Sequence, residues 1–348
     1  MQEVTTSNQK KRSSNFELLR IVAMLMILSL HSFPTDNECY TYSLATGVDF
    51  FREACCISAV NCYVLISGYF TIKWKKKSFC SLVYQVMFWL LLIYVLALIV
   101  GLQPLNMKEL LRRINGIVNA YWFITTYLIL YLIAPVLNAF IEKSTERELG
   151  CFLVIFYTVQ TYFSLLFSEI FGIGCGVMSF AGLYMVGAFF KKNGLPQKVR
   201  QLKIGLYSVV VIMTLIITAM LWLEFFVLGC DMLKVKTSFW GLAYNNPLII
   251  CQSIAIFLLF SSFTFQSKRI NTIATSILAV YLFHMHPDVK QWYYDYTRSL
   301  YGLSLSNHYI RLALLFLLVF VVAILIDRIR LFTFSFLYNR LISNQNEI

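Results

Sequence analysis

The sequence predicts an all-α integral membrane protein, with about ten transmembrane helices in one bundle that encloses a polar cavity. Of the 348 residues, 59% are hydrophobic and only 13% are charged, whereas a soluble domain has about a quarter of its residues charged. The apolar residues gather in runs of about twenty, the length that crosses the hydrocarbon core of a bilayer. Within the first run lie two ionisable residues, Arg20 and His31, and such residues usually face a cavity or a partner.

Ten apolar runs are expected to span the membrane. In chain order they cover residues 16–34, 48–72, 79–101, 121–141, 149–167, 170–190, 204–229, 245–265, 271–287 and 309–327. No linker rich in Pro, Gly or Ser separates them. We therefore predict one membrane domain over residues 15–331, preceded by a cytoplasmic tail at 1–14 and followed by another at 332–348.

The net charge of +12 is distributed as in a membrane protein, and no nucleic-acid partner is predicted. With Arg20 set aside, ten spans place nineteen basic residues on the side of the N-terminus and nine on the other side. Because cytoplasmic loops carry the excess of Lys and Arg, both termini are expected in the cytoplasm. The basic segment 103–120 fits this distribution worst, and its apolar spacing predicts a helix at the membrane interface.

The cysteines and histidines give no metal-binding pattern. The nine cysteines include no Cys-x-x-Cys pair and lie mostly in apolar runs, where they act as small apolar side chains. Cys39 and Cys230 fall in predicted outer loops, so a disulfide between them is the alternative. His284 and His286 are two residues apart, on different faces of a helix. We predict no metal site.

Arg20 and His31 share one face of the first predicted helix. Eleven steps of about 100° return to within roughly 20° of the start and advance about 16 Å along the axis. The pair therefore indicates a buried polar path. In the alternative interpretation, Arg20 reaches to the inner interface and His31 lies near the outer headgroups.

The spacing Arg20-x10-His31 resembles the signature of the acyltransferase 3 family, bacterial membrane enzymes that transfer acyl groups, usually acetyl, to envelope glycans. The segment 59–70, Ala-Val-Asn-Cys-Tyr-Val-Leu-Ile-Ser-Gly-Tyr-Phe, is similar to the family motif Gly-Val-Asp/Asn-x-Phe-Phe-x-x-Ser-Gly-Phe/Tyr. The matching positions are Asn61, Ser67, Gly68 and Tyr69. The upstream segment 47–51 resembles the opening of this motif but lacks a Ser-Gly at the right distance, so we do not assign it.

Two later segments also resemble the family, in the expected order. One contains Trp122 and Tyr127, and the other contains Tyr281 and His284. As alternatives, the aromatic residues belong to the interfacial belt or the core, Asn61, Ser67 and Tyr69 hold helices together, and His284 anchors the chain at the interface.

The resemblance implies an O-acyltransferase in the bacterial cell membrane that uses cytoplasmic acyl-CoA, most directly acetyl-CoA, as donor substrate, with no permanently bound cofactor. The acceptor would be a cell-surface or lipid-linked polysaccharide. The alternatives are a polysaccharide exporter or flippase-like protein without acyl transfer, and an O-succinyltransferase. No oligomeric state is predicted.

The resemblance also assigns roles to individual residues. His31 would be the general base on the acceptor hydroxyl or would carry the acyl group itself, and Arg20 would contact the donor. Asn61, Ser67, Tyr69, Trp122, Tyr127, Tyr281 and His284 would line the substrate path. The family's Arg-x-x-Arg is replaced here by a lysine-rich segment, and its residues Lys73, Lys75, Lys76 and Lys77 would hold the phosphates of coenzyme A as point charges. A solvated membrane anchor is the alternative for these lysines.

Overall fold

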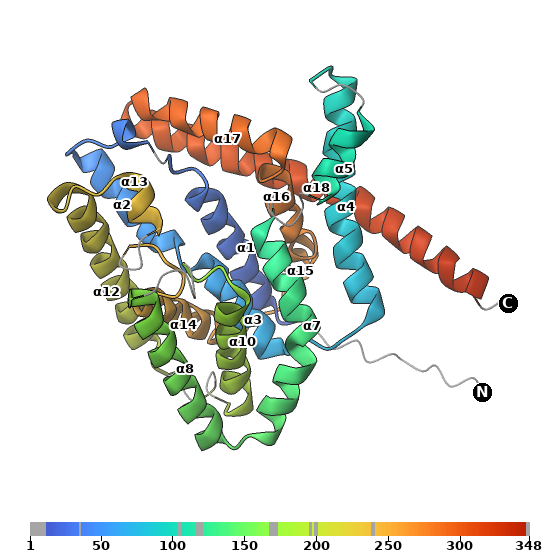
Figure 1. The fold of residues 1–348 in the computed structure, drawn as a ribbon, viewed down its shortest axis with the longest axis horizontal. Helices are drawn as coiled ribbons and strands as arrows, with labels where there is room; N and C mark the ends of the chain where they lie inside the picture. Colours follow the sequence, from blue (N-terminus) through green and yellow to red (C-terminus); the bar gives the residue numbers. More distant parts are fainter. Residues whose placement is uncertain are drawn as a thin grey trace.

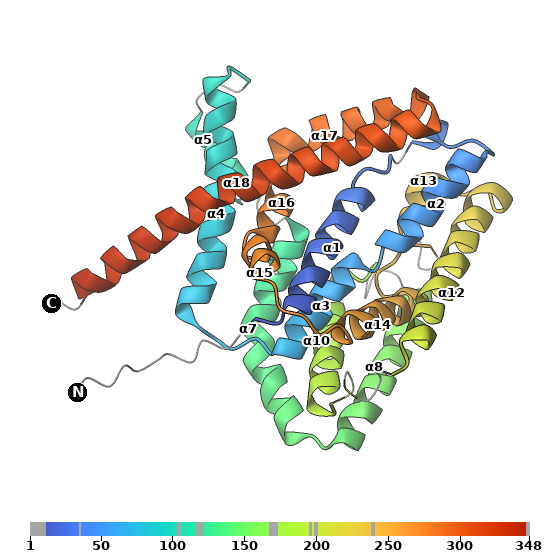
Figure 2. The same cartoon turned by 180° about the vertical axis from the view of Figure 1, so that it is seen from behind.

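The computed structural model describes residues 12–345, without 35, 103–105, 116–120, 167–172, 195–196, 198–200 and 238–240. Within this part of the chain the secondary structure is entirely helical. Figures 1 and 2 show a bundle of tilted helices from which α4 and the second half of α18 project on one side.

Six helical segments of the described chain are long and apolar enough to cross a membrane, which supports an integral membrane protein. They are Leu44–Phe70, Lys76–Ile99, Trp122–Lys143, Glu146–Leu165, Lys203–Val227 and Leu305–Tyr338. The predicted number of ten spans is not confirmed, because three further apolar helices are shorter than about 18 residues. These are α1 (Ser14–Leu30), α10 (Val177–Lys192) and α14 (Pro247–Ser261).

The predicted second span, 48–72, consists of two helices. Helix α2 (Leu44–Cys56) and helix α3 (Ala59–Phe70) are separated by a turn at Ile57 and Ser58. The remaining predicted spans correspond to α4 (Lys76–Ile99), α7 (Trp122–Lys143), α8 (Glu146–Leu166) and α12 (Lys203–Trp222), the last extended by a π-helical turn at Leu223–Val227.

The prediction of one span over 271–287 is wrong. This segment contains α15 (Lys268–Ala274), α16 (Ile277–His284) and the start of α17 (Pro287–Ser299). A proline lacks the backbone N–H that a continuing helix needs but suits a first helical turn. At this start His286 is the N-cap, and its Nδ1 accepts a hydrogen bond from the Asp288 backbone N–H, 3.2 Å away.

Helix α1 occupies the centre of the bundle, where it contacts α2, α3, α14, α15 and α16. Helix α3, which packs against α1, also crosses α10 at very short distance. A Cβ atom added to Gly68 would lie 1.9 Å from the carbonyl oxygen of Tyr184, and one added to Gly187 would lie 2.2 Å from that of Leu65. Small residues at helix contacts allow such an approach, so the glycine of the Ser-Gly-Tyr segment has a packing role.

The last helix, α18 (Leu305–Gln345), continues beyond the end of the predicted last span at 327. The region assigned to a C-terminal tail, 332–348, is therefore helical at least to Gln345. Arg330 is one of the nineteen basic residues that the ten-span assignment places on the side of the N-terminus. It is buried and forms an ion pair with Asp327, with 2.7 Å between Nη2 and Oδ2. Gln85 and Trp89 of α4 donate hydrogen bonds to the same carboxylate and join α4 to α18.

Part of the predicted interface segment 103–120 forms α5 (Met107–Asn115), and residues 103–105 and 116–120 lie outside the described residues. Arg113 on this helix is bonded to Asp288 at the start of α17, with 2.8 Å between Nη2 and Oδ1. This ion pair neutralises a basic residue on the side that the charge rule assigns to the outside. Cys39 and Cys230 are both free thiols, so the alternative of a disulfide between them is not supported.

Candidate functional site: a cavity along the first helix

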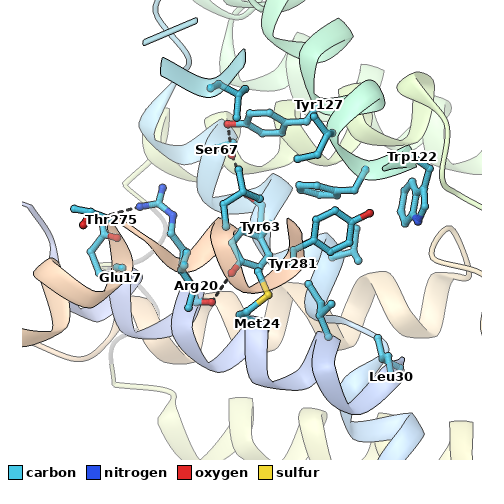
Figure 3. Close-up of a pocket in the computed structure, with 18 of the residues that line it drawn as sticks. Glu17, Arg20, Met24, Leu30, Tyr63, Ser67, Trp122, Tyr127, Thr275 and Tyr281 are labelled. Atoms are coloured by element: carbon cyan, nitrogen blue, oxygen red, sulfur yellow. Dashed lines mark hydrogen bonds and ion pairs between the residues drawn. The ribbon is translucent and has the colours of Figure 1, made fainter. Parts of the chain in front are cut away.

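A cavity of about 340 Å³ lies along α1 and is bordered by α3, α7 and α16. Figure 3 shows Arg20 and Leu30 toward opposite ends of the α1 wall. Most of the lining is aromatic or aliphatic, and the charged groups are confined to one end. The structure thus has a cavity where the sequence predicted one, but the expectation of a polar lining is not confirmed.

At one end of the cavity, Arg20 is held by an acidic neighbour. Its Nη1 atom is 2.7 Å from Oε1 of Glu17, one helical turn earlier on α1. The same carboxylate oxygen is 3.9 Å from Nε of Arg12. Tyr63 of α3 donates a hydrogen bond of 2.6 Å to the backbone oxygen of Arg20 (Figure 3). Two arginines against one glutamate leave this end positively charged, which suits an anion.

At the other end, His31 caps the C-terminus of α1 and contacts a second histidine. Nδ1 of His31 is 2.8 Å from Nε2 of His284, which is fully buried. Nδ1 of His284 is 2.5 Å from the carbonyl oxygen of Val280. The two residues are 253 positions apart in the sequence.

These contacts determine where the protons of two neutral imidazoles lie. A carbonyl oxygen only accepts hydrogen bonds, so Nδ1 of His284 must donate to Val280 and its Nε2 must accept. Nδ1 of His31 then donates to His284, and the lone pair of His31 lies on Nε2. When His31 gains a proton at Nε2, the acceptor at its Nδ1 stabilises the resulting imidazolium. The pair can therefore act as an oriented base.

The turn that carries His31 is fixed by a partly buried arginine on α2. Arg52 Nη1 donates to the hydroxyls of Ser29 and Ser32, at 3.2 and 2.7 Å, on either side of His31 in the sequence. Its Nη2 is 2.9 Å from Oδ1 of Asp49, which also accepts a hydrogen bond from Tyr309 of α18. Sequence reasoning missed Arg52 and Asp49, although oppositely charged residues three apart within an apolar run are a recognisable signal.

Four of the residues expected on the substrate path line the cavity, namely Ser67, Trp122, Tyr127 and Tyr281. The Ser67 hydroxyl donates to the Tyr63 backbone oxygen at 2.9 Å and is 3.2 Å from the Tyr127 hydroxyl (Figure 3). Their polar atoms join α3 to α7 across the cavity wall. Tyr244, which sequence reasoning missed, also lines the cavity and packs against Trp122, with ring centroids 5.9 Å apart.

Asn61 and Tyr69 have other surroundings. Asn61 is fully buried and donates a hydrogen bond of 2.9 Å to the backbone oxygen of Tyr244, so it supports the wall from behind. Tyr69 packs against Phe16 and Phe257, with ring centroids 4.9 and 5.6 Å away. Residues two apart point to different faces of a helix, which explains why Tyr69 cannot share the orientation of Ser67.

The lysines expected to bind the donor lie on the exposed segment between α3 and the first turn of α4. All four, Lys73, Lys75, Lys76 and Lys77, are exposed, and none belongs to the cavity lining. Figures 1 and 2 place this connection at the same end of the bundle as the start of α1. The lysines are thus near the end with Arg12 and Arg20, outside the cavity itself.

A family model described as an acyltransferase domain matches residues 13–328, nearly the whole chain. The match includes Arg20 and His31 and begins one residue after Arg12. No curated protein and no solved structure matches the chain.

Proposed function

This chain belongs to the acyltransferase family whose model covers residues 13–328, and from that premise we propose that it is a membrane O-acyltransferase. It would move an acyl group, most directly acetyl, from acyl-CoA to a hydroxyl of a cell-surface or lipid-linked polysaccharide. The observation that carries this proposal is one cavity with arginines at one end and an oriented histidine pair at the other.

The donor would bind with its phosphates at the arginine end. Guanidinium groups are well suited to phosphate oxygens, and Arg12 and Arg20 both line this end. The lysines from Lys73 to Lys77 would attract the anion over a longer range. The long, largely uncharged arm of coenzyme A would follow the aromatic wall and bring the thioester toward His31.

His31 would be the catalytic base. Its Nε2 takes the proton from the acceptor hydroxyl as that oxygen forms a bond to the thioester carbonyl carbon. The tetrahedral intermediate then breaks its C–S bond, and the leaving thiolate takes the proton back from Nε2. His284 is a positioning residue, because it acts through the tautomer of His31.

We place the protein in the bacterial cell membrane with both termini in the cytoplasm. The lysines of the connection between α3 and α4 are exposed at the same end of the bundle as the start of α1, and a basic connection of this kind favours the cytoplasmic side. The arginine end of the cavity then faces the compartment that supplies acyl-CoA, and His31 lies deeper, toward the outer surface.

Comparing the surface glycan of cells with and without the gene tests the proposal. We expect loss of O-linked acetyl with the amount of glycan unchanged, and transfer of labelled acetyl from acetyl-CoA by the purified protein. Loss of glycan with unchanged acylation of the remainder would favour export. Transfer from succinyl-CoA in preference to acetyl-CoA would identify an O-succinyltransferase.

A further inference from the structure

A second cavity, of about 460 Å³, lies on the other side of His31. Leu30 and His31 line both this cavity and the one described above. The second cavity is bordered by α17, which runs along the edge of the molecule opposite the connection between α3 and α4 (Figures 1 and 2). His31 therefore lies between two spaces that face opposite ends of the bundle.

The lining contributed by α17 is polar. Gln291, Tyr294, Asp295 and Arg298 follow the spacing i, i+3, i+4 and i+7, so they share one face of the helix. The Gln291 side-chain amide donates to Oδ1 of Asp295 at 2.9 Å. The exposed carboxylate and amide can exchange hydrogen bonds with hydroxyl groups.

The charges in this lining do not favour an anion. Arg298 forms an ion pair with Asp36 of the segment that follows α1, so its charge is already compensated. Asp295 adds a further negative charge. Two more cations lie nearby in the described structure. Arg52 is 3.8 Å from the ring centroid of Phe33, which lines this cavity, but its charge is compensated by Asp49. Nζ of Lys290 lies 5.5 Å from the Tyr294 ring centroid.

We infer that the second cavity binds the acceptor as a neutral or amino sugar, in preference to a uronic acid or another anionic sugar. Hydroxyl groups of the sugar would donate to Asp295 and exchange hydrogen bonds with Gln291, while the Tyr294 ring covers an apolar face. The hydroxyl to be acylated would point toward His31. The reaction that follows binding rests on the proposed function, but sugar binding is measured separately.

The test uses the purified full-length protein and two probes, methyl N-acetylglucosaminide and methyl glucuronide. Saturation-transfer NMR reports the binding of each. We expect the neutral sugar to bind about tenfold more tightly, because a carboxylate near Asp295 is repelled. Asp295→Lys should reverse this preference. Asp231→Lys makes the same charge change at an aspartate outside both sets of lining residues and should leave the preference unchanged.

Equal binding of both sugars, or an Asp295→Lys protein with unaltered preference, would overturn the inference. If acetyl transfer from acetyl-CoA persists in the wild-type protein in that case, the proposed function stands and only the acceptor site is wrong. If the preference reverses while no acetyl transfer is found, the sugar site stands and the proposed function fails.

Discussion

The two ends of α1 differ in the chemistry that surrounds them. At the start of the helix, Arg20 is partly exposed and shares one carboxylate with Arg12. At its end, His31 contacts another imidazole, and Arg52 holds the adjoining turn through two serine hydroxyls. The first end has excess positive charge, whereas the second is an ordered network of hydrogen bonds.

This difference indicates that the two ends of the cavity have different functions. An end with excess positive charge binds anions and tolerates some freedom of its side chains. A base must be held in one orientation and one tautomer, which requires partners on several elements. Changes at the histidine end should therefore lower turnover, whereas changes at the arginine end should raise the donor concentration that the reaction requires.

The largest effect is expected from His31→Ala. Removing the base should lower kcat by about 10²- to 10⁴-fold, the usual contribution of general base catalysis. Acetyl transfer by the purified variant measures the loss, and its yield from membranes checks folding. The better-matched variant His31→Gln keeps a polar side chain and should lose a similar amount. Full activity of either variant would remove His31 from the mechanism.

A smaller loss is expected from His284→Phe, which removes the acceptor for Nδ1 of His31 but leaves the base. Loss of a partner that orients a functional histidine typically costs about 10- to 100-fold. His284→Gln keeps an acceptor oxygen and should retain more kcat than His284→Phe. If the two variants behave alike, the hydrogen bond between the histidines has no role in turnover.

Changes at the arginine end of the cavity should alter KM for acetyl-CoA. Arg20→Lys keeps the charge but loses the planar fork, so we expect KM for acetyl-CoA to rise about tenfold, as for one lost hydrogen bond to a charged group. Turnover at saturating donor should change little. A steady-state titration of acetyl-CoA separates the two parameters. A fall in kcat at unchanged KM would contradict the assignment of this end to donor binding.

The smallest effect is expected from replacing Lys75, Lys76 and Lys77 together by Gln. Since these residues are exposed and outside the cavity lining, their attraction is screened over about 10 Å at 0.1 M salt. KM for acetyl-CoA should rise about two- to threefold at low ionic strength and match wild type at high salt. Mapping of both termini controls for a change in topology. A large, salt-independent rise would place these lysines in direct contact with the donor.

Helix periodicity explains what the sequence could predict about the site. Arg20 and His31 line one cavity because eleven residues make close to three turns, and this relation needs no knowledge of the rest of the fold. The same geometry separates Ser67 from Tyr69. Applied to the whole segment 59–70, helix periodicity would have excluded Tyr69 from the cavity lining.

Contacts between distant segments could not be predicted in this way. The pairing of His31 with His284 depends on the position of α16. This helix is short, because the chain turns just before Ile277 and again just after His284. A hydropathy average over residues 271–287 does not detect these turns, so it predicts one continuous span. Pro287 was the local signal that the helix ends, whereas the position of His284 against α1 is set by tertiary packing.

The central claim is that the two imidazoles act as one catalytic unit. A double-mutant cycle of His31 and His284 tests it most directly. The measured quantity is kcat for acetyl transfer by wild type, His31→Ala, His284→Phe and the double variant. If His284 acts only through His31, adding His284→Phe to the His31→Ala protein leaves the residual kcat unchanged. If the losses of the two single variants instead multiply in the double variant, the histidines act independently and the proposed mechanism is contradicted.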